Sequence, residues 1–175
     1  AIQLLEFDRV RERLASYTSF QLGRELAQAL VPLYQREDIG QSLQETREAM
    51  LVIEAGSGLT LSGAQDIRDA VRRAALGGVL LGSELTAVAQ TLSVFRTVRA
   101  ALLRQKANAP ILAGKIEAIP AFQMLQSEIG RCIGEAGEVL DAASPHLAEY
   151  RAKARSAYVE LQNALQQIVD STGGR

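Results

Sequence analysis

Residues 144–170 read SPHLAEYRAKARSAYVELQNALQQIVD, which is the longest helical pattern of the chain. Apolar residues recur there every three or four positions, the period of one helix face, at Leu147, Tyr150, Ala154, Tyr158, Leu161, Leu165 and Ile168. Ser144 and Pro145 occupy the positions that favour a helix N-cap and a proline in the first turn. A helix over residues 144–170 would be ~40 Å long at 1.5 Å per residue. We therefore expect it to extend away from its domain.

The residues before position 144 also show mainly helical periodicity. The expected helices cover residues 7–17, 22–30, 37–54, 63–75, 83–102 and 122–133, with a helix of one or two turns inside 108–120. Gly134 and Gly137 bracket a turn, and residues 138–141 predict a short β-like stub. The sequence therefore predicts an all-α fold, with a multi-helical core domain over 1–143 and a lever-like helix over 144–175.

Capping residues mark two of these helix ends. Asp66 is expected to cap the helix over 63–75, and Gly77 and Gly78 are expected to stop it. Ser83 is the expected N-cap of the next helix. Because Glu84 follows one residue later, and a capping box needs a spacing of three, no capping box is expected there.

Two helices carry heptad-like seams. In the helix over 37–54 the seam has a 4-3-4-3 spacing and consists of Ile39, Leu43, Thr46, Met50 and Ile53. The last helix repeats this spacing from Ala154 onward. Such seams pack against a second helix. One hypothesis for the function is therefore a helical protein–protein interaction or dimerisation module that binds no nucleic acid.

The composition is that of a globular cytoplasmic chain. The sequence is 47% hydrophobic and 22% charged, far from the composition of disordered chains. Its net charge of −1 provides no overall basic field for nucleic acid. A single cysteine fits a reducing compartment, and no apolar run is long enough to span a membrane. The chain begins with Ala1 and not Met, and lacks the pattern of a signal peptide, so we expect a fragment of a longer protein.

The residues that usually carry catalysis or bind metals are sparse. His146 is the only histidine and lies at the start of a helix, where an exposed polar side chain is ordinary. Cys132 has helical spacing with Ile129 and Ile133, which favours a small core residue over a reactive thiol. One Cys and one His cannot complete a zinc site, and the phosphate-binding motif G-x-x-x-x-G-K-[ST] is missing. We expect no catalytic, cofactor-binding or metal-binding residue in this chain.

Clusters of basic residues are the candidate sites for nucleic-acid contact. One cluster lies in the helix over 63–75, and the other lies towards the end of the helix that begins near Ser83. Together they comprise Arg68, Arg72, Arg73, Arg96, Arg99, Arg104 and Lys106. Each could contact a phosphate group, yet basic residues on the polar face of an amphipathic helix are usually only solvated. Neither a continuous basic stripe nor stacking aromatic residues accompany them.

Three blocks of sequence carry a resemblance to a known family. Residues 137–147 read GEVLDAASPHL and lead into the long charged helix. Residues 4–10 read LLEFDRV, and LGRELA follows at 22–27. Asp66-Ile67-Arg68 precedes GGVL at 77–80. In order and spacing these blocks resemble the second bacterial MutS type, the paralogue that lacks mismatch-recognition domains. Ala136 and Ala142 depart from the family pattern, where Asp and Ser are usual.

The resemblance implies an N-terminal core and lever region that is not itself catalytic. It implies a parent chain with an ATPase domain that uses ATP and magnesium, and with a C-terminal Smr endonuclease domain. Members of the family act on branched or duplex DNA in suppressing homologous recombination, or on the ribosome and its RNA in rescuing stalled ribosomes. The resemblance also implies a homodimeric, cytoplasmic parent.

Overall fold

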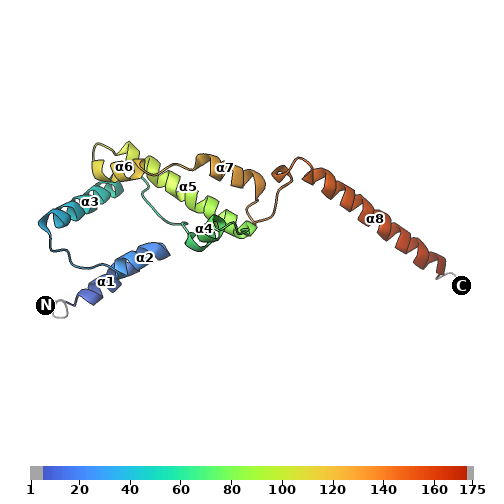
Figure 1. The fold of residues 1–175 in the computed structure, drawn as a ribbon, viewed down its shortest axis with the longest axis horizontal. Helices are drawn as coiled ribbons and strands as arrows, with labels where there is room; N and C mark the ends of the chain where they lie inside the picture. Colours follow the sequence, from blue (N-terminus) through green and yellow to red (C-terminus); the bar gives the residue numbers. More distant parts are fainter. Residues whose placement is uncertain (1–5, 173–175) are drawn as a thin grey trace.

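The chain forms an elongated all-α structure with a long C-terminal helix, as predicted (Figure 1). The computed structural model describes residues 6–172; Leu4 and Leu5 of the first motif lie outside this range. The helices are α1 (Phe7–Ser16), α2 (Gln21–Gln28), α3 (Arg36–Glu54), α4 (Arg68–Ala75), α5 (Gly82–Arg104), α6 (Pro110–Glu117), α7 (Gln123–Cys132), the 3-10 helix η2 (Asp141–Ala143) and α8 (Leu147–Thr172). Within the described residues, no helix combines the length and apolarity needed to cross a membrane.

α5 is the central helix, and the other elements pack on one another in a row. α6 and α7 both pack on α5, α3 packs on α6, and η2 lies between α7 and α8. Figure 1 shows α3 and α6 at one end of this row and α8 at the other. The core lies where α3, α5 and α6 meet, and its buried residues are Val52, Val98, Leu102, Ala109 and Ile116. On α5, Val88 is buried as well.

Glu48 of α3 fixes the N-terminal end of α6. Its side chain is fully buried, and its Oε2 atom accepts the backbone N–H groups of Ile111 and Leu112, each at 3.0 Å. Those two N–H groups belong to the first turn of α6, where a helix has no backbone acceptors of its own. Ala109, the N-cap, has no side-chain acceptor. A carboxylate also complements the positive end of the helix dipole, so Glu48 replaces a local cap.

The other end of α6 is held by Arg99 of α5. Its Nη1 atom donates to the carbonyl oxygen of Ile119 at 3.0 Å and to that of Ile116. A cation at the C-terminal end of a helix again complements the dipole. α6 is only eight residues long, shorter than a helix that is stable in isolation. Its neighbours therefore supply the interactions that keep it helical.

A glycine turn joins α7 to α8 and docks on the start of α5. Ile133 and Val139 form an isolated antiparallel bridge, which corresponds to the predicted β-like stub. Gly137 has a φ of +82°, a conformation that favours glycine. Its carbonyl oxygen lies so close to Gly82 that a β-carbon on Gly82 would collide with it. The turn and α5 therefore touch backbone to backbone.

Two arginines hold η2 and the root of α8. Arg151 of α8 donates to the carbonyl oxygen of Val139 at 2.8 Å and pairs with Asp141. From α7, Arg131 donates to the carbonyl oxygen of Ala142. Beyond this root α8 projects away from the other helices (Figure 1). The division into domains at 143/144 stays a prediction.

Several predicted helix ends are wrong by a few residues. α4 begins at Arg68 and not at Gly63, because residues 64–67 form an irregular loop. α5 begins at Gly82 with Leu81 as its N-cap, so Glu84 is the third helical residue. Its carboxylate accepts the N–H of Leu81 at 2.9 Å, which is one half of a capping box. α8 begins at Leu147, two residues after Pro145, which was predicted to lie in its first turn.

The apolar seam of α3 is not the face that the structure buries. Ile39, Leu43, Met50 and Ile53 are all exposed, whereas Glu48 and Val52 are fully buried against α6 and α5. Val10 and Leu14 of α1 are also exposed. No helix among the described residues covers the α3 seam, so its predicted partner stays a prediction.

Replacing Glu48 with Ala should destabilise the fold, because the N–H groups of Ile111 and Leu112 would lose their acceptor inside the core. Each buried donor left unpaired costs about 1–3 kcal/mol, so we expect a loss of about 2–4 kcal/mol. Urea unfolding followed by circular dichroism measures it. Gln44→Ala, at an exposed position of the same helix, is the control; an equal effect of the two substitutions would contradict the capping role.

Candidate nucleic-acid interface

α4 carries three of the predicted basic residues, and the loop before it sets their positions. Asp66 Oδ1 accepts the backbone N–H of Arg68 at 3.1 Å, but the N-cap of α4 is Ile67, which makes no side-chain capping hydrogen bond, so the prediction of Asp66 as the cap is wrong by one residue. Gly77 ends the helix with a φ of +79°, and the N–H of Gly78 bonds back to the carbonyl of Arg73 at 2.9 Å. This pattern is a common glycine helix stop.

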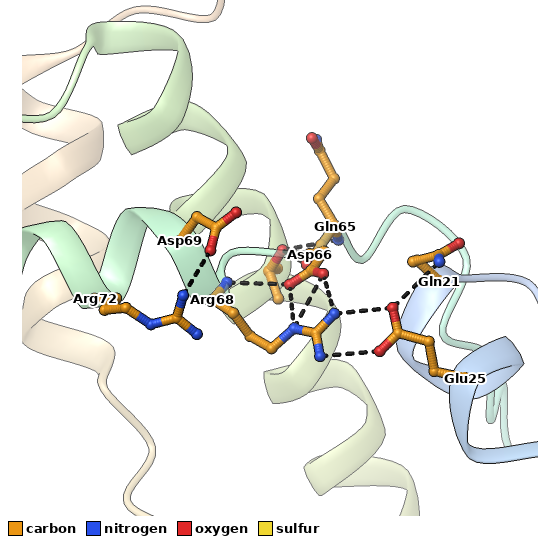
Figure 2. A network of polar contacts seen from close by, with 8 residues as sticks. Gln21, Glu25, Gln65, Asp66, Arg68, Asp69 and Arg72 are labelled. Atoms are coloured by element: carbon orange, nitrogen blue, oxygen red, sulfur yellow. Dashed lines mark hydrogen bonds and ion pairs between the residues drawn. The ribbon is translucent and has the colours of Figure 1, made fainter. Parts of the chain in front are cut away.

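Arg68 lies between two carboxylates from different parts of the chain (Figure 2). Its Nε atom donates to Asp66 Oδ1 at 2.9 Å, and its Nη2 atom donates to Asp66 Oδ2 at 2.5 Å. On the other side, Nη1 lies 2.9 Å from Glu25 Oε2 and Nη2 lies 3.0 Å from Glu25 Oε1. Glu25 belongs to α2, so Arg68 connects the first two helices to α4.

The charges of this network shift each other's pKa values. Hydrogen bonds from Arg68 lower the pKa of Glu25 and that of Asp66 below their ordinary values. The two carboxylates in turn raise the pKa of Arg68. All three side chains are partly exposed, from 30% for Asp66 to 49% for Arg68. Solvent therefore screens these pairs, and each is weak in water.

Gln65 ties the same loop to the middle of α5. Its backbone N–H donates to Thr91 Oγ1 at 3.0 Å, and its Nε2 atom donates to Gln90 Oε1 at 2.9 Å. The start of α4 is thus attached to α5 by neutral hydrogen bonds and to α2 by charged ones.

The other two arginines of α4 also have acidic partners. Arg72 pairs with Asp69 at 3.1 Å, one turn before it, and its side chain is 72% exposed (Figure 2). Arg73 pairs with Glu84 of α5. Hydrogen bonds from the N–H of Leu81 and from Arg73 lower the pKa of Glu84. Among the three, Arg72 has the least constrained side chain.

The second basic cluster lies in the C-terminal half of α5 and just after it, away from α4. Arg99 is engaged with α6, Arg104 reaches the carbonyl oxygen of Ser57 at 3.5 Å, and Lys106 pairs with Glu117 at 2.8 Å. The side chain of Arg96 is exposed and makes no ion pair or hydrogen bond with the residues that the structure describes. The two clusters therefore do not merge into one basic surface, and Arg72 and Arg96 are their most available cations.

The acidic partners were missed in the sequence. The pair of Asp69 and Arg72 follows the helical spacing of three that favours ion pairs, so a charge pattern does predict it. Glu25 and Arg68 are 43 residues apart, and no local pattern connects them. The same holds for Arg73 and Glu84, which are 11 residues apart and lie on either side of the turn at Gly77.

His146 and Cys132 lie in ordinary surroundings. His146 is exposed, with its ring 6.2 Å from that of Tyr150. Cys132 is half-buried in α7, with its Sγ atom 3.8 Å from Glu128 Oε1. A groove of about 700 Å³ lies between α5 and α7, and the only charged residue that lines it is Glu135. Within residues 6–172, no cluster of three or more His, Cys, Asp or Glu residues suits a metal ion.

Comparisons with known proteins find that nearly the whole chain is similar to one group of proteins. No protein-family model matches it. It is 34% identical over 173 residues to endonuclease MutS2 of Geobacillus sp. (strain WCH70), covering 97% of this chain. It is 35% identical over 170 residues to endonuclease MutS2 of Symbiobacterium thermophilum, and 32% identical over 177 residues to that of Shouchella clausii. The chain is homologous to a segment of endonuclease MutS2.

The alignments cover nearly all of this chain but only a small part of each relative. The chain spans only 22% of the Geobacillus MutS2 and 21% of the Symbiobacterium MutS2. The alignments cover 97% and 99% of the chain. The predicted resemblance to the second bacterial MutS type is thereby confirmed.

The ion pairs of Arg68 should weaken in acid. Because the folded pKa values of Glu25 and Asp66 are depressed, the pairs contribute stability above the unfolded-state values of about 4, and this is lost as the pH falls through the folded-state values. Carboxyl ¹³C chemical shifts, recorded against pH, measure the two midpoints. Arg68→Gln should raise both midpoints, whereas Arg72→Gln should leave that of Glu25 unchanged; an unmoved Glu25 midpoint in Arg68→Gln would contradict the network.

Proposed function

We propose that the chain is a non-catalytic core-and-lever segment of a MutS2-type protein, with α8 as the beginning of the lever. The observation that supports this most directly is the geometry of α8. It is a helix of 26 residues that packs on η2 at its root and projects from the other helices. A helix of this length that covers no core of its own domain is suited to transmitting movement.

The row of packed helices gives such a lever a stiff base. η2 and the glycine turn join α8 to α7 and to the start of α5, and α5 in turn carries the core with α3 and α6. A rotation of the body relative to α8 must pass through Arg131, Arg151 and the contact of Gly82 with Gly137. The base is therefore held by specific contacts rather than by a flexible linker.

The rest of the proposal concerns the whole protein. A MutS2-type parent supplies an ATPase domain, with ATP and magnesium, and an endonuclease domain, and it acts as a homodimer in the cytoplasm. Its target is branched or duplex DNA in suppressing recombination, or the ribosome and its RNA in rescuing stalled ribosomes. In this chain the exposed cations Arg72 and Arg96 are the best candidates to contact phosphate groups. Arg72 pairs only with Asp69, one turn away in the same helix, and the Arg96 side chain has no partner among the described residues.

Fluorescence anisotropy with duplex DNA, a four-way junction and structured RNA tests the nucleic-acid contact, at low and at physiological salt. We expect salt-sensitive binding that Arg72→Gln combined with Arg96→Gln weakens, with the slope against log salt reduced by about 2. Arg24→Gln combined with Arg36→Gln, which removes two exposed arginines elsewhere, is the matched control. If no nucleic acid binds, or if both pairs of substitutions act equally, the two clusters are not the interface. A preference for RNA over the junction would favour the ribosome as target.

A helical interaction or dimerisation module is the second candidate function. It is favoured by the exposed apolar residues of α8, including Tyr158, Leu161 and Leu165, each more than half exposed. In a dimer these residues would be covered by a second helix.

Changing both Leu161 and Leu165 to Asp tests this second candidate. If the residues lie in an intermolecular seam, the molar mass measured by light scattering should fall while the helical circular dichroism is kept. Asn163→Asp combined with Gln167→Asp adds the same charges, with the same spacing, on another face of α8. A mass that both pairs lower equally, or that neither changes, would count against a seam at Leu161 and Leu165.

A further inference from the structure

The α1–α2 hairpin behaves as a unit of its own. The two helices pack on each other, and Ala15 and Ala27 are buried. Gly23 of α2 lies close to Thr18, so that a β-carbon on Gly23 would be 3.4 Å from Thr18 Cβ. Neither helix packs extensively on α3, α4 or α5. The hairpin is therefore internally tight but loosely attached.

Arg68 is the main polar attachment of this hairpin to the body. Among the described residues, the pair with Glu25 is the one ion pair that joins α2 to a later helix. Gln21, one turn before Glu25, donates to Glu25 Oε1 at 3.2 Å and keeps its carboxylate turned towards Arg68 (Figure 2). Elsewhere, residues 17–20 and 59–61 line a hollow between the hairpin and the body.

The guanidinium of Arg68 has both of its donor edges occupied. The Nε/Nη2 edge faces Asp66, and the Nη1/Nη2 edge faces Glu25. A phosphate group prefers the same two-pronged contact that a carboxylate makes with arginine. A phosphate that binds Arg68 must therefore displace one of the two carboxylates.

Glu25 is the carboxylate that a phosphate displaces more easily. Asp66 is two residues from Arg68 and also accepts its backbone N–H, so it stays close whatever the hairpin does. Glu25 is 43 residues away, and its pair with Arg68 requires the hairpin to be docked. Closing the longer loop costs more conformational entropy, and a partly exposed ion pair returns little free energy.

We propose that Arg68 is a latch, and that a nucleic-acid phosphate exchanges with Glu25 on Arg68 and thereby releases the α1–α2 hairpin from α4. The exchange rests on the proposed nucleic-acid contact at α4, and it adds a conformational response to that contact. Because linkage is reciprocal, docking of the hairpin must weaken nucleic-acid binding by the same factor by which binding weakens docking. Gln65 keeps α4 on α5 throughout, so the movement is confined to the hairpin.

Pulsed electron–electron double resonance on the 175-residue chain measures the distance between two spin labels, and thereby the docking of the hairpin. Cys132→Ser removes the native thiol, and Gln28→Cys with Ala100→Cys places spin labels on exposed positions of α2 and α5. Without ligand, Glu25→Gln should broaden and lengthen the distance distribution. Glu12→Gln, an exposed glutamate in the same hairpin with the same change of charge, should leave it unchanged. An unchanged distribution in Glu25→Gln would overturn the latch, whether or not nucleic acid binds.

Adding the four-way junction tests the exchange. It should shift the parent distribution towards that of Glu25→Gln, and Glu25→Gln should bind the junction about two- to fivefold more tightly than Glu12→Gln, the range expected for one partly exposed pair. Arg68→Gln should open the hairpin too, but weaken binding, which separates a latch from a purely structural contact. Binding without a change of distance would overturn the exchange and leave the proposed function intact. No binding would contradict both, while the ligand-free distances still report on the latch.

Discussion

The buried carboxylate of Glu48 is the interaction on which the folded body depends. Its Oε2 atom supplies the first turn of α6 with the acceptors that the local sequence lacks. Its Oε1 atom, also buried, makes no hydrogen bond with protein atoms, so burying the group carries a cost that only the helix end offsets. Without α6 the core loses Ala109 and Ile116, and Arg99 loses the carbonyls that it binds. The face of α3 that carries Glu48 and Val52 is consequently the buried one.

Several basic side chains, like that of Glu48, connect one helix to another. Three of the seven candidates for phosphate contact join one helix to another: Arg99 joins α5 to α6, Arg73 joins α4 to α5, and Arg68 joins α4 to α2. A cation in such a position has two potential roles, since the geometry that holds a carboxylate also suits a phosphate. Availability, more than charge, distinguishes Arg72 and Arg96 from the rest.

Periodicity and breakers were enough to predict the helices, because both act locally. The predicted range 37–54 matches α3 within one residue at its start and agrees at its end. Gly56 and Gly58 break the helix just after that end. The faces were harder to predict. The apolar seam of α3 looked like the buried side, but which side is buried depends on α6, whose contact with Glu48 spans 63 residues of sequence. Likewise, the start of α5 depends on Glu84, whose side chain reaches back to Leu81. With Ser83 taken as the N-cap, the spacing of three between Leu81 and Glu84 was not recognised. For the candidate site, the cations were visible in the sequence and their distant acidic partners were not.

The contact of Gly82 with Gly137 lies near the root of α8, where a small tilt would displace the far end of the helix by a larger distance. α8 has 26 residues and is therefore ~39 Å long at 1.5 Å per residue. If the glycine turn tilts its root by ~1 Å over one helical turn of ~5.4 Å, the far end of a rigid α8 moves by ~7 Å, in proportion to the two lengths. The contact between Gly82 and Gly137 is made only of backbone atoms, so no side-chain rotamer at that contact can absorb the tilt. If α8 acts as the proposed lever, small displacements in the body become large ones at its tip.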